Sequence, residues 1–239
     1  MAIKPRQIAL IISTVFVGCS PAADENRFIY QGDTDREMIE FFKEASSLGI
    51  KEITISSFGG RESSALAIAD IVSRDEISLT VRGFCTSSCA IYLLPAARSV
   101  HIEPNSIIAV HSNSYGMLEL GYVTDDVPNE VKLNHKNSIE LFKETNTDLR
   151  LLKESTDQIE LRCIKSDPDT GKRRIFGQYD NWVPTASFMR SVGVDFTGFW
   201  PADEKEARSV FFEYFKPDTK VKFGNPEPIE RVRVPLPSC

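Results

Sequence analysis

The chain has 239 residues, enough for one large domain or two small ones, and 41% of them are hydrophobic and 26% charged. This balance is typical of a folded globular protein and excludes an intrinsically disordered chain. The net charge of −6 at pH 7 argues against a nucleic-acid-binding protein, because such proteins carry a clustered excess of basic residues.

The first 23 residues have the pattern of an export signal. Two basic residues precede an apolar run, Ile8 to Val17, which is too short to span a membrane and is followed by small residues. A Phe-Val-Gly tripeptide before Cys19 resembles the box that precedes the lipid-bearing cysteine of bacterial lipoproteins. We therefore expect residues 1–23 to be a signal peptide, with Cys19 lipidated and the protein anchored to a membrane of the periplasm or cell envelope. Ordinary cleavage after Ala22 is the alternative.

In the first half of the remaining chain, short apolar runs typical of strands alternate with segments whose apolar residues have helical spacing. Strands are expected at 27–30, 52–56, 77–82, 100–102 and 107–110, and helices at 36–47, 62–73 and 87–96. Asp33 or Thr34 is expected to cap the first helix, and Gly49 to end it. Strands that alternate with helices of about a dozen residues predict an α/β fold of stacked βα units around a mostly parallel sheet.

The second half of the chain is more polar. The expected elements are a long helix at 128–153, a basic, glycine-containing exposed excursion at 167–179, a short helix at 185–191 and an extended, proline-rich segment at 225–237. We expect one domain over residues 24–200 and a C-terminal extension, 201–239, packed on its surface.

Four cysteines remain if Cys19 is lipidated, and an even number in an oxidising compartment favours disulfides. Cys85 and Cys89 lie four residues apart, on one face of a helical turn, and Cys163 and Cys239 are the other expected pair. A metal site is a weaker interpretation, because no second Cys or His pair follows at ligand spacing. Free, buried thiols are the remaining alternative. No metal or other cofactor is expected.

Polar residues and glycines follow three of the predicted strands. In a parallel sheet such strand ends meet at one edge, where backbone amides and helix N-termini face a ligand. Gly59 and Gly60 follow the second strand and let N–H groups approach an oxyanion closely. Ser87 lies at the turn between the third strand and its helix, and His111 ends the strand at 107–110.

The order of these motifs resembles that of a known superfamily. Strand, Gly-Gly, helix, strand, Gly-x-x-x-Ser, helix and strand-terminal His is similar to the Clp protease proteolytic subunit and the ClpP/crotonase superfamily. The Cys-x-Ser-x-Cys turn at 85–89, followed by Val-His-Ser at 110–112, resembles a group of predicted periplasmic members. The similarity runs from Arg27 to Gly193 and is tightest over residues 53–112.

The resemblance implies a ClpP/crotonase-like fold with a serine hydrolase site. By position, Ser87 corresponds to the nucleophile and His111 to the general base. The amides of Ser88 and of Gly59 or Gly60 correspond to the oxyanion hole. Members of this superfamily often form rings or trimers, so the resemblance also suggests a homo-oligomer.

The third member of a triad is the least well matched residue. Asn181 aligns with the acidic position of the family, and Asp180 precedes it by one residue; we prefer Asp180. The chain also has Phe58 where the family has proline. His101 and His135 lack any matching context and are interpreted as surface residues.

The sequence therefore favours an exported serine hydrolase, a peptidase acting on peptides or unfolded chains in the cell envelope. The alternative is a non-catalytic binding or assembly module on the same fold, which the shifted acid and Phe58 favour. Acyl-CoA chemistry of the crotonase branch is disfavoured, because an exported protein meets little coenzyme A. An ATP-driven unfoldase partner is not expected, since export removes access to cytoplasmic ATP.

Overall fold

The computed structural model describes residues 28–123, 127–166, 173–229 and 236–239, so the expected signal peptide and Cys19 lie outside the described residues. No helix in these ranges is both long and apolar enough to cross a membrane. The elements in chain order are β1 (Phe28–Gln31), α1 (Arg36–Ser47), β2 (Glu52–Ser57), α2 (Glu62–Arg74), β3 (Ser78–Thr86), the π-helical η1 (Cys89–Leu93), α3 (Leu94–Ala96), β4 (Val100–Ile102), β5 (Ile107–Ala109), α4 (Ser114–Glu119), α5 (Asn129–Glu144), α6 (Arg150–Asp157), β6 (Leu161–Ser166), β7 (Arg173–Gly177), β8 (Asn181–Pro184), α7 (Ala186–Ser191), β9 (Thr197–Gly198), α8 (Glu204–Tyr214) and β10 (Val221–Gly224).

The central sheet is parallel throughout, with the order β1-β2-β3-β4-β9 and with β5 also paired to β3. β3 is long enough to have two partners on one edge: its first half pairs with β4 and its last three residues pair with β5. Two small sheets, the parallel pair β8–β10 and the antiparallel pair β6–β7, complete the fold. The predicted α/β class with a mostly parallel sheet is confirmed.

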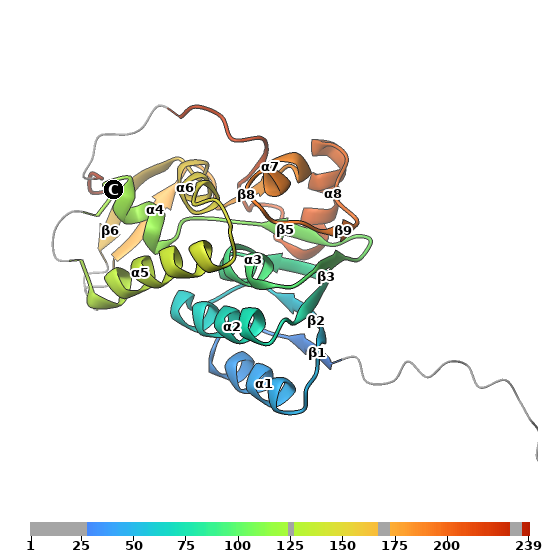
Figure 1. Cartoon of the computed structure of the whole chain (residues 1–239). Coiled ribbons are helices and arrows are strands. Elements are labelled where there is room, and N and C mark those ends of the chain that lie inside the picture. Colours follow the sequence, from blue (N-terminus) through green and yellow to red (C-terminus); the bar gives the residue numbers. More distant parts are fainter. Residues whose placement is uncertain (1–27, 124–126, 167–172, 230–235) are drawn as a thin grey trace, which may run out of the picture.

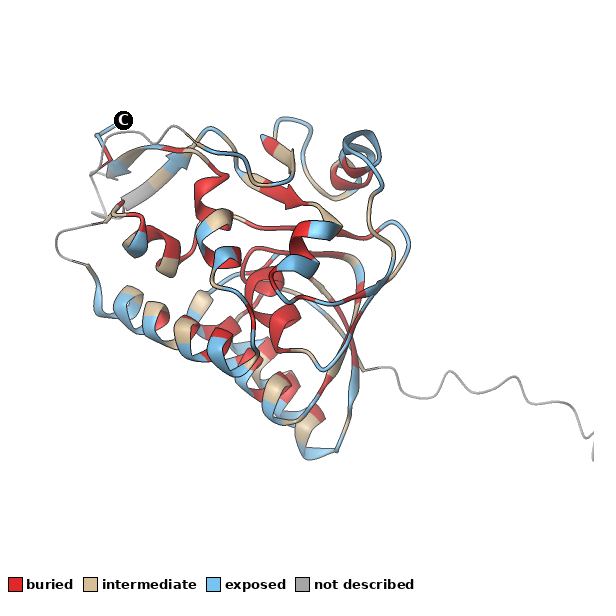
Figure 2. Ribbon diagram, turned by 45° about the horizontal axis from the view of Figure 1, so that its top comes forward, coloured by how far each residue is buried: buried red, intermediate tan, exposed pale blue. Residues whose placement is uncertain are grey.

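One large hydrophobic core joins the central sheet to α1, α2, η1 and α3. α1, α2 and α5 lie side by side (Figure 1). Met38 and Phe42 of α1, and Ile68 and Val72 of α2, are fully buried at the spacing of one helical turn. Figure 2 shows buried residues along the strands and the inner faces of these helices, and exposed residues on their outer faces. The helices therefore form by burying one apolar face, as their periodicity predicts.

The C-terminal part of the chain supplies a second, smaller core. α8 buries Val210 and Phe211 in a cluster that includes Phe84 of β3 and Ile107 of β5. β10 pairs with β8, and β8 in turn contacts the end of β5 through a bridge between Val110 and Trp182. The extension is therefore packed against the two strands that lead to Ser87 and His111.

The predicted cap of the first helix is wrong. Asp35 caps α1, because its carboxylate accepts hydrogen bonds from the amides of Glu37 and Met38. Thr34 is fully buried and serves a different purpose, since its hydroxyl lies 2.7 Å from the Ser88 Oγ. Ser88, the partner of Thr34, is 54 residues away in the sequence, so the local sequence pattern could not reveal this hydrogen bond.

Two further predictions need correction in the second half of the chain, and one helix was not predicted. Residues 128–153 form two helices, because Asn146 adopts a left-handed conformation (φ +54°) that ends α5. The basic excursion contains strand β7, while residues 167–172 of it lie outside the described residues. α4 has no counterpart among the predicted elements, although Asn113, whose side chain caps it, was a readable signal.

Candidate active site

Ser87 occupies the turn between β3 and η1 in a left-handed backbone conformation, with φ at +57°. This conformation is uncommon for a residue with a side chain, and such residues cluster at functional sites. The Ser87 amide donates to the carbonyl of Ala109 at 2.8 Å, which ties the turn to the end of β5. Only 7% of the Ser87 surface is exposed.

One disulfide spans the turn that contains Ser87, and a second one joins the C-terminal residue to β6. Cys85 and Cys89 are joined by an S–S bond of 2.05 Å and flank Ser87 on both sides, and both are fully buried. Cys163 of β6 is joined to Cys239, as expected. In the part of the chain that the structure describes, no group of three or more His, Cys, Asp or Glu side chains could hold a metal ion.

Gly59 packs directly against Ser87. A Cβ atom on Gly59 would lie 2.5 Å from the Ser87 Cβ and 2.9 Å from its Oγ, and the φ of Gly59 is +87°. Only glycine fits here without displacing the serine. The Gly59 carbonyl accepts a hydrogen bond from the Thr34 amide at 2.7 Å. Because a peptide unit is planar and trans, this bond turns the Gly60 N–H away from Thr34.

Two of the three amides expected to form an oxyanion hole have no acceptor in the described part of the chain. Among the described residues, the N–H groups of Gly60 and Ser88 donate to no protein atom. The Gly59 N–H, in contrast, donates to the Ser57 Oγ at 3.1 Å. The amides of Gly60 and Ser88 are therefore the pair available to a substrate oxygen.

His111 follows β5 at the same edge of the sheet as Ser87. The parallel register pairs Thr86 with Ala109, so Ser87 and His111 follow paired positions on adjacent strands. Burial lowers the pKa of His111, although the hydrogen bond to the Ser112 carbonyl acts in the opposite direction, and the ring is neutral near pH 7. Ser87 Oγ makes no hydrogen bond to the imidazole, or to any other group within the described ranges.

Asp180 and Asn181 differ in their relation to His111. Asp180 is exposed, and its carboxylate accepts a hydrogen bond from the Lys220 amide at 2.9 Å. The antiparallel bridge between Val110 and Trp182 puts Asn181, one residue earlier, opposite His111. The register therefore brings Asn181, and not the preferred Asp180, to the position across from His111.

The imidazole of His111 does have an orienting partner. Its Nδ1 lies 3.0 Å from the carbonyl oxygen of Ser112. An Nδ1–H that donates to this oxygen leaves Nε2 unprotonated, which is the state that a general base requires. The other two histidines lie elsewhere: His101 contacts Thr197, and His135 pairs with Glu119.

Glu62, the first residue of α2, is a polar residue of the site that sequence reasoning missed. Its carboxylate accepts hydrogen bonds from the Ser114 amide at 3.1 Å, from the Ser114 Oγ at 2.5 Å and from the Tyr92 hydroxyl. Burial and the nearby Glu62 charge raise the pKa of Tyr92, so this hydroxyl stays protonated. Glu62 thus connects the segments that follow Gly60, Ser87 and His111. An acidic residue at a helix N-terminus, two residues after the Gly-Gly pair, was the available signal.

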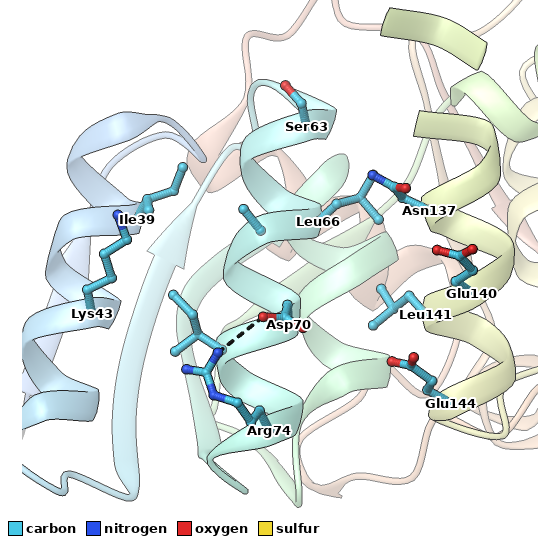
Figure 3. A pocket seen from close by; sticks show the side chains of 12 residues that line it. Ile39, Lys43, Ser63, Leu66, Asp70, Arg74, Asn137, Glu140, Leu141 and Glu144 are labelled. Atoms are coloured by element: carbon cyan, nitrogen blue, oxygen red, sulfur yellow. Dashed lines mark hydrogen bonds and ion pairs between the residues drawn. The ribbon is translucent and has the colours of Figure 1, made fainter. Parts of the chain in front are cut away.

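A surface hollow of about 810 Å³ lies between α1, α2 and α5, away from these residues (Figure 3). An ion pair of 3.2 Å between Asp70 and Arg74 lies on its α2 side. The hollow is lined by Ile39, Lys43, Ser63, Leu66, Ala67, Asp70, Ile71, Arg74, Asn137, Glu140, Leu141 and Glu144. None of the candidate catalytic residues lines it.

No protein-family model matches the sequence, and no curated protein gives a significant match. The ClpP protease catalytic domain from Plasmodium falciparum is similar in structure, with a TM-score of 0.43 at 14% identity over 74% of this chain and 86% of that chain. A ClpP1 mutant from Listeria monocytogenes has a TM-score of 0.40 at 16% identity over 76% and 94% of the two chains. Another ClpP1 structure from Listeria monocytogenes has a TM-score of 0.40 at 16% identity over 55% and 78%. At these values the likeness says nothing about catalysis.

Proposed function

We propose that this chain is a serine hydrolase with Ser87 as its nucleophile and His111 as its general base. The observation that carries the proposal is the turn at Ser87. This serine has φ at +57° and lies against Gly59, and the amides of Gly60 and Ser88, the next residues after these two, have no acceptor among the described residues. A nucleophile held at a sheet edge beside amide donors is the arrangement that attack on a carbonyl group needs.

In the proposed reaction, Ser87 Oγ attacks the scissile carbonyl carbon while His111 Nε2 takes the serine proton. The carbonyl oxygen, now negative, receives hydrogen bonds from the amides of Gly60 and Ser88. The imidazolium then returns the proton to the leaving group, and a water molecule hydrolyses the acyl-enzyme by the same steps. The neutral state of the half-buried His111, whose pKa is lowered by desolvation, supports its role as the base.

The proposed location is the periplasm or cell envelope, with residues 1–23 as the signal peptide and Cys19 as the lipid anchor. Two disulfides, Cys85–Cys89 and Cys163–Cys239, support it, because such bonds persist in oxidising compartments. The proposed substrates are peptides or unfolded chains, following the sequence resemblance to Clp protease subunits. A homo-oligomer belongs to the same proposal.

A non-catalytic binding or assembly module is the second candidate. The absence of a hydrogen bond between Ser87 and His111 within the described residues favours it, as does the exposed position of Asp180. Catalytic hydrogen bonds are often long or unformed in the absence of substrate, so the first observation is compatible with a hydrolase.

Labelling with a fluorophosphonate probe, which modifies activated serines, separates the two candidates. We expect the protein purified from the cell envelope to be labelled, and Ser87→Ala and His111→Ala to abolish labelling without loss of folding. Ser99→Ala and His101→Ala are matched controls, because both residues are exposed and lie outside the site. A folded parent that stays unlabelled would refute the hydrolase and favour the binding module.

A further inference from the structure

We infer that the backbone carbonyl of Ser112 takes the place of the triad acid, and that Thr156 of α6 is the positioning residue that holds this carbonyl in place. The inference rests on the proposed function, since it concerns the base of the same site. The Ser112 carbonyl oxygen lies 3.0 Å from His111 Nδ1, and among the described residues it is the hydrogen-bond partner of the imidazole.

The peptide unit that follows Ser112 is held at both ends. Its carbonyl pairs with His111 Nδ1, and its N–H, which belongs to Asn113, donates to the Thr156 Oγ1 at 3.2 Å. In a planar trans peptide the C=O and N–H groups point in opposite directions. One hydrogen bond at each end therefore fixes the direction in which the Ser112 carbonyl faces the imidazole.

The Asn113 side chain strengthens this clamp. Its Nδ2 donates to the Leu152 carbonyl at 2.7 Å and to the Ser155 Oγ at 2.8 Å, and its Oδ1 accepts from the Gly116 amide at 2.9 Å. Asn113 is 6% exposed and Thr156 is fully buried. A buried polar cluster whose members are all hydrogen-bonded is rigid and holds a single arrangement.

The next residue is fixed from the opposite side of the site. Ser114 donates through both its amide and its hydroxyl to Glu62 at the start of α2. Two consecutive residues after Ser112 are therefore anchored to two different helices, α6 and α2. This explains how the carbonyl can orient His111 although no carboxylate is hydrogen-bonded to the ring among the described residues.

The chemical role of a triad acid is to hold the imidazole in one tautomer and one orientation and to stabilise the imidazolium. A fixed carbonyl performs the first task through an Nδ1–H···O bond and contributes a partial negative charge to the second. Asp180 is then dispensable, because among the described residues His111 Nδ1 pairs with the Ser112 carbonyl and the Asp180 carboxylate accepts from the Lys220 amide instead.

The decisive variant is Thr156→Val, which keeps the shape of the side chain and removes its hydroxyl. We expect its maximal rate of fluorophosphonate labelling to fall about 10- to 100-fold with an unchanged half-saturating probe concentration, because only the orientation of the base changes. Thr156→Ser should restore the rate. Thr147→Val removes another buried hydroxyl, paired with Thr145, and Asp180→Asn removes the exposed charge; both should label like the parent.

Nitrogen-15 NMR of the imidazole tests the hydrogen bond without any need for activity. The chain has three histidines, so a variant with His101→Gln and His135→Gln leaves His111 as the single imidazole. We expect the neutral ring to carry its proton on Nδ1. A ring protonated on Nε2 overturns the inference even if Ser87 is labelled, and this result is obtained whether or not Thr156→Val folds.

The remaining outcomes separate this inference from the proposed function. An Nδ1–H ring in a parent that is never labelled supports the Ser112 hydrogen bond and refutes the hydrolase. A Thr156→Val protein with full labelling overturns the role of Thr156, as does an Asp180→Asn protein that loses labelling to the same extent.

Discussion

The contact between Gly59 and Ser87 leads to a prediction that separates backbone strain from damage to the site. In Gly59→Ala, the new Cβ would lie 2.5 Å from the Ser87 Cβ and 2.7 Å from the Thr86 carbonyl oxygen. Neither neighbour is the flexible end of a long side chain, so the turn that carries the nucleophile must move.

Two costs add in this variant. An alanine at positive φ is disfavoured by about 1–2 kcal/mol, and forcing an extra carbon into a packed region costs about 1–3 kcal/mol. We therefore expect Gly59→Ala to lower the free energy of unfolding by about 2–5 kcal/mol. Gly49→Ala is the matched control, because Gly49 also has a positive φ of +71° but a Cβ added there would have no neighbouring atom within 4 Å. It should lose only about 1–2 kcal/mol, the backbone cost alone.

Urea unfolding measures both free energies, and fluorophosphonate labelling of the folded proteins measures the site. We expect Gly59→Ala to lose labelling under conditions where it is fully folded, and Gly49→Ala to retain it. A folded Gly59→Ala protein that is labelled as fast as the parent would show that the position of Ser87 against the glycine loop is irrelevant to its reactivity.

Three other predictions concern the groups around the nucleophile. Replacing Cys85 and Cys89 together by alanine should lower the unfolding free energy by about 2 kcal/mol, the value for a short loop, and should slow labelling; an unchanged labelling rate contradicts the role of this bridge. Burial lowers the pKa of His111, so labelling should persist below the ordinary histidine value of about 6.5 and disappear as the pH falls through the lowered value. The stability that this neutral ring contributes is present above about pH 6.5 and is lost as the pH falls, which urea unfolding at several pH values can measure. A pH midpoint of labelling above about 6.5 would contradict this reasoning. Glu62→Ala leaves buried donors without an acceptor and should lower the free energy of unfolding in urea by about 2–4 kcal/mol. Glu130→Ala, which removes one exposed contact, should lower it by less than about 1 kcal/mol in the same assay.

Local sequence pattern accounts for most of the secondary structure in the first half of the chain. The bounds expected for α1 agree with the structure, and those for β2, α2 and β4 agree within one residue. These elements bury one apolar face each, so the spacing of apolar residues is sufficient to locate them. The prediction is poorer between residues 113 and 179, where polar side chains decide where helices end. Asn146 divides the expected long helix by adopting a left-handed conformation, which the surrounding polar sequence does not predict.

The sequence by itself determined which residues end the strands of the candidate site: the glycine pair, Ser87 and His111. Parallel strands end at one edge, so chain order alone places these residues near each other. The tertiary structure decided the hydrogen-bond partners. Asp180 binds the Lys220 amide, 40 residues away, and Asn113 binds Thr156, 43 residues away. Such pairings depend on how α6 and β10 pack against the sheet, and a polar side chain carries no local signal of the distant group that will satisfy it.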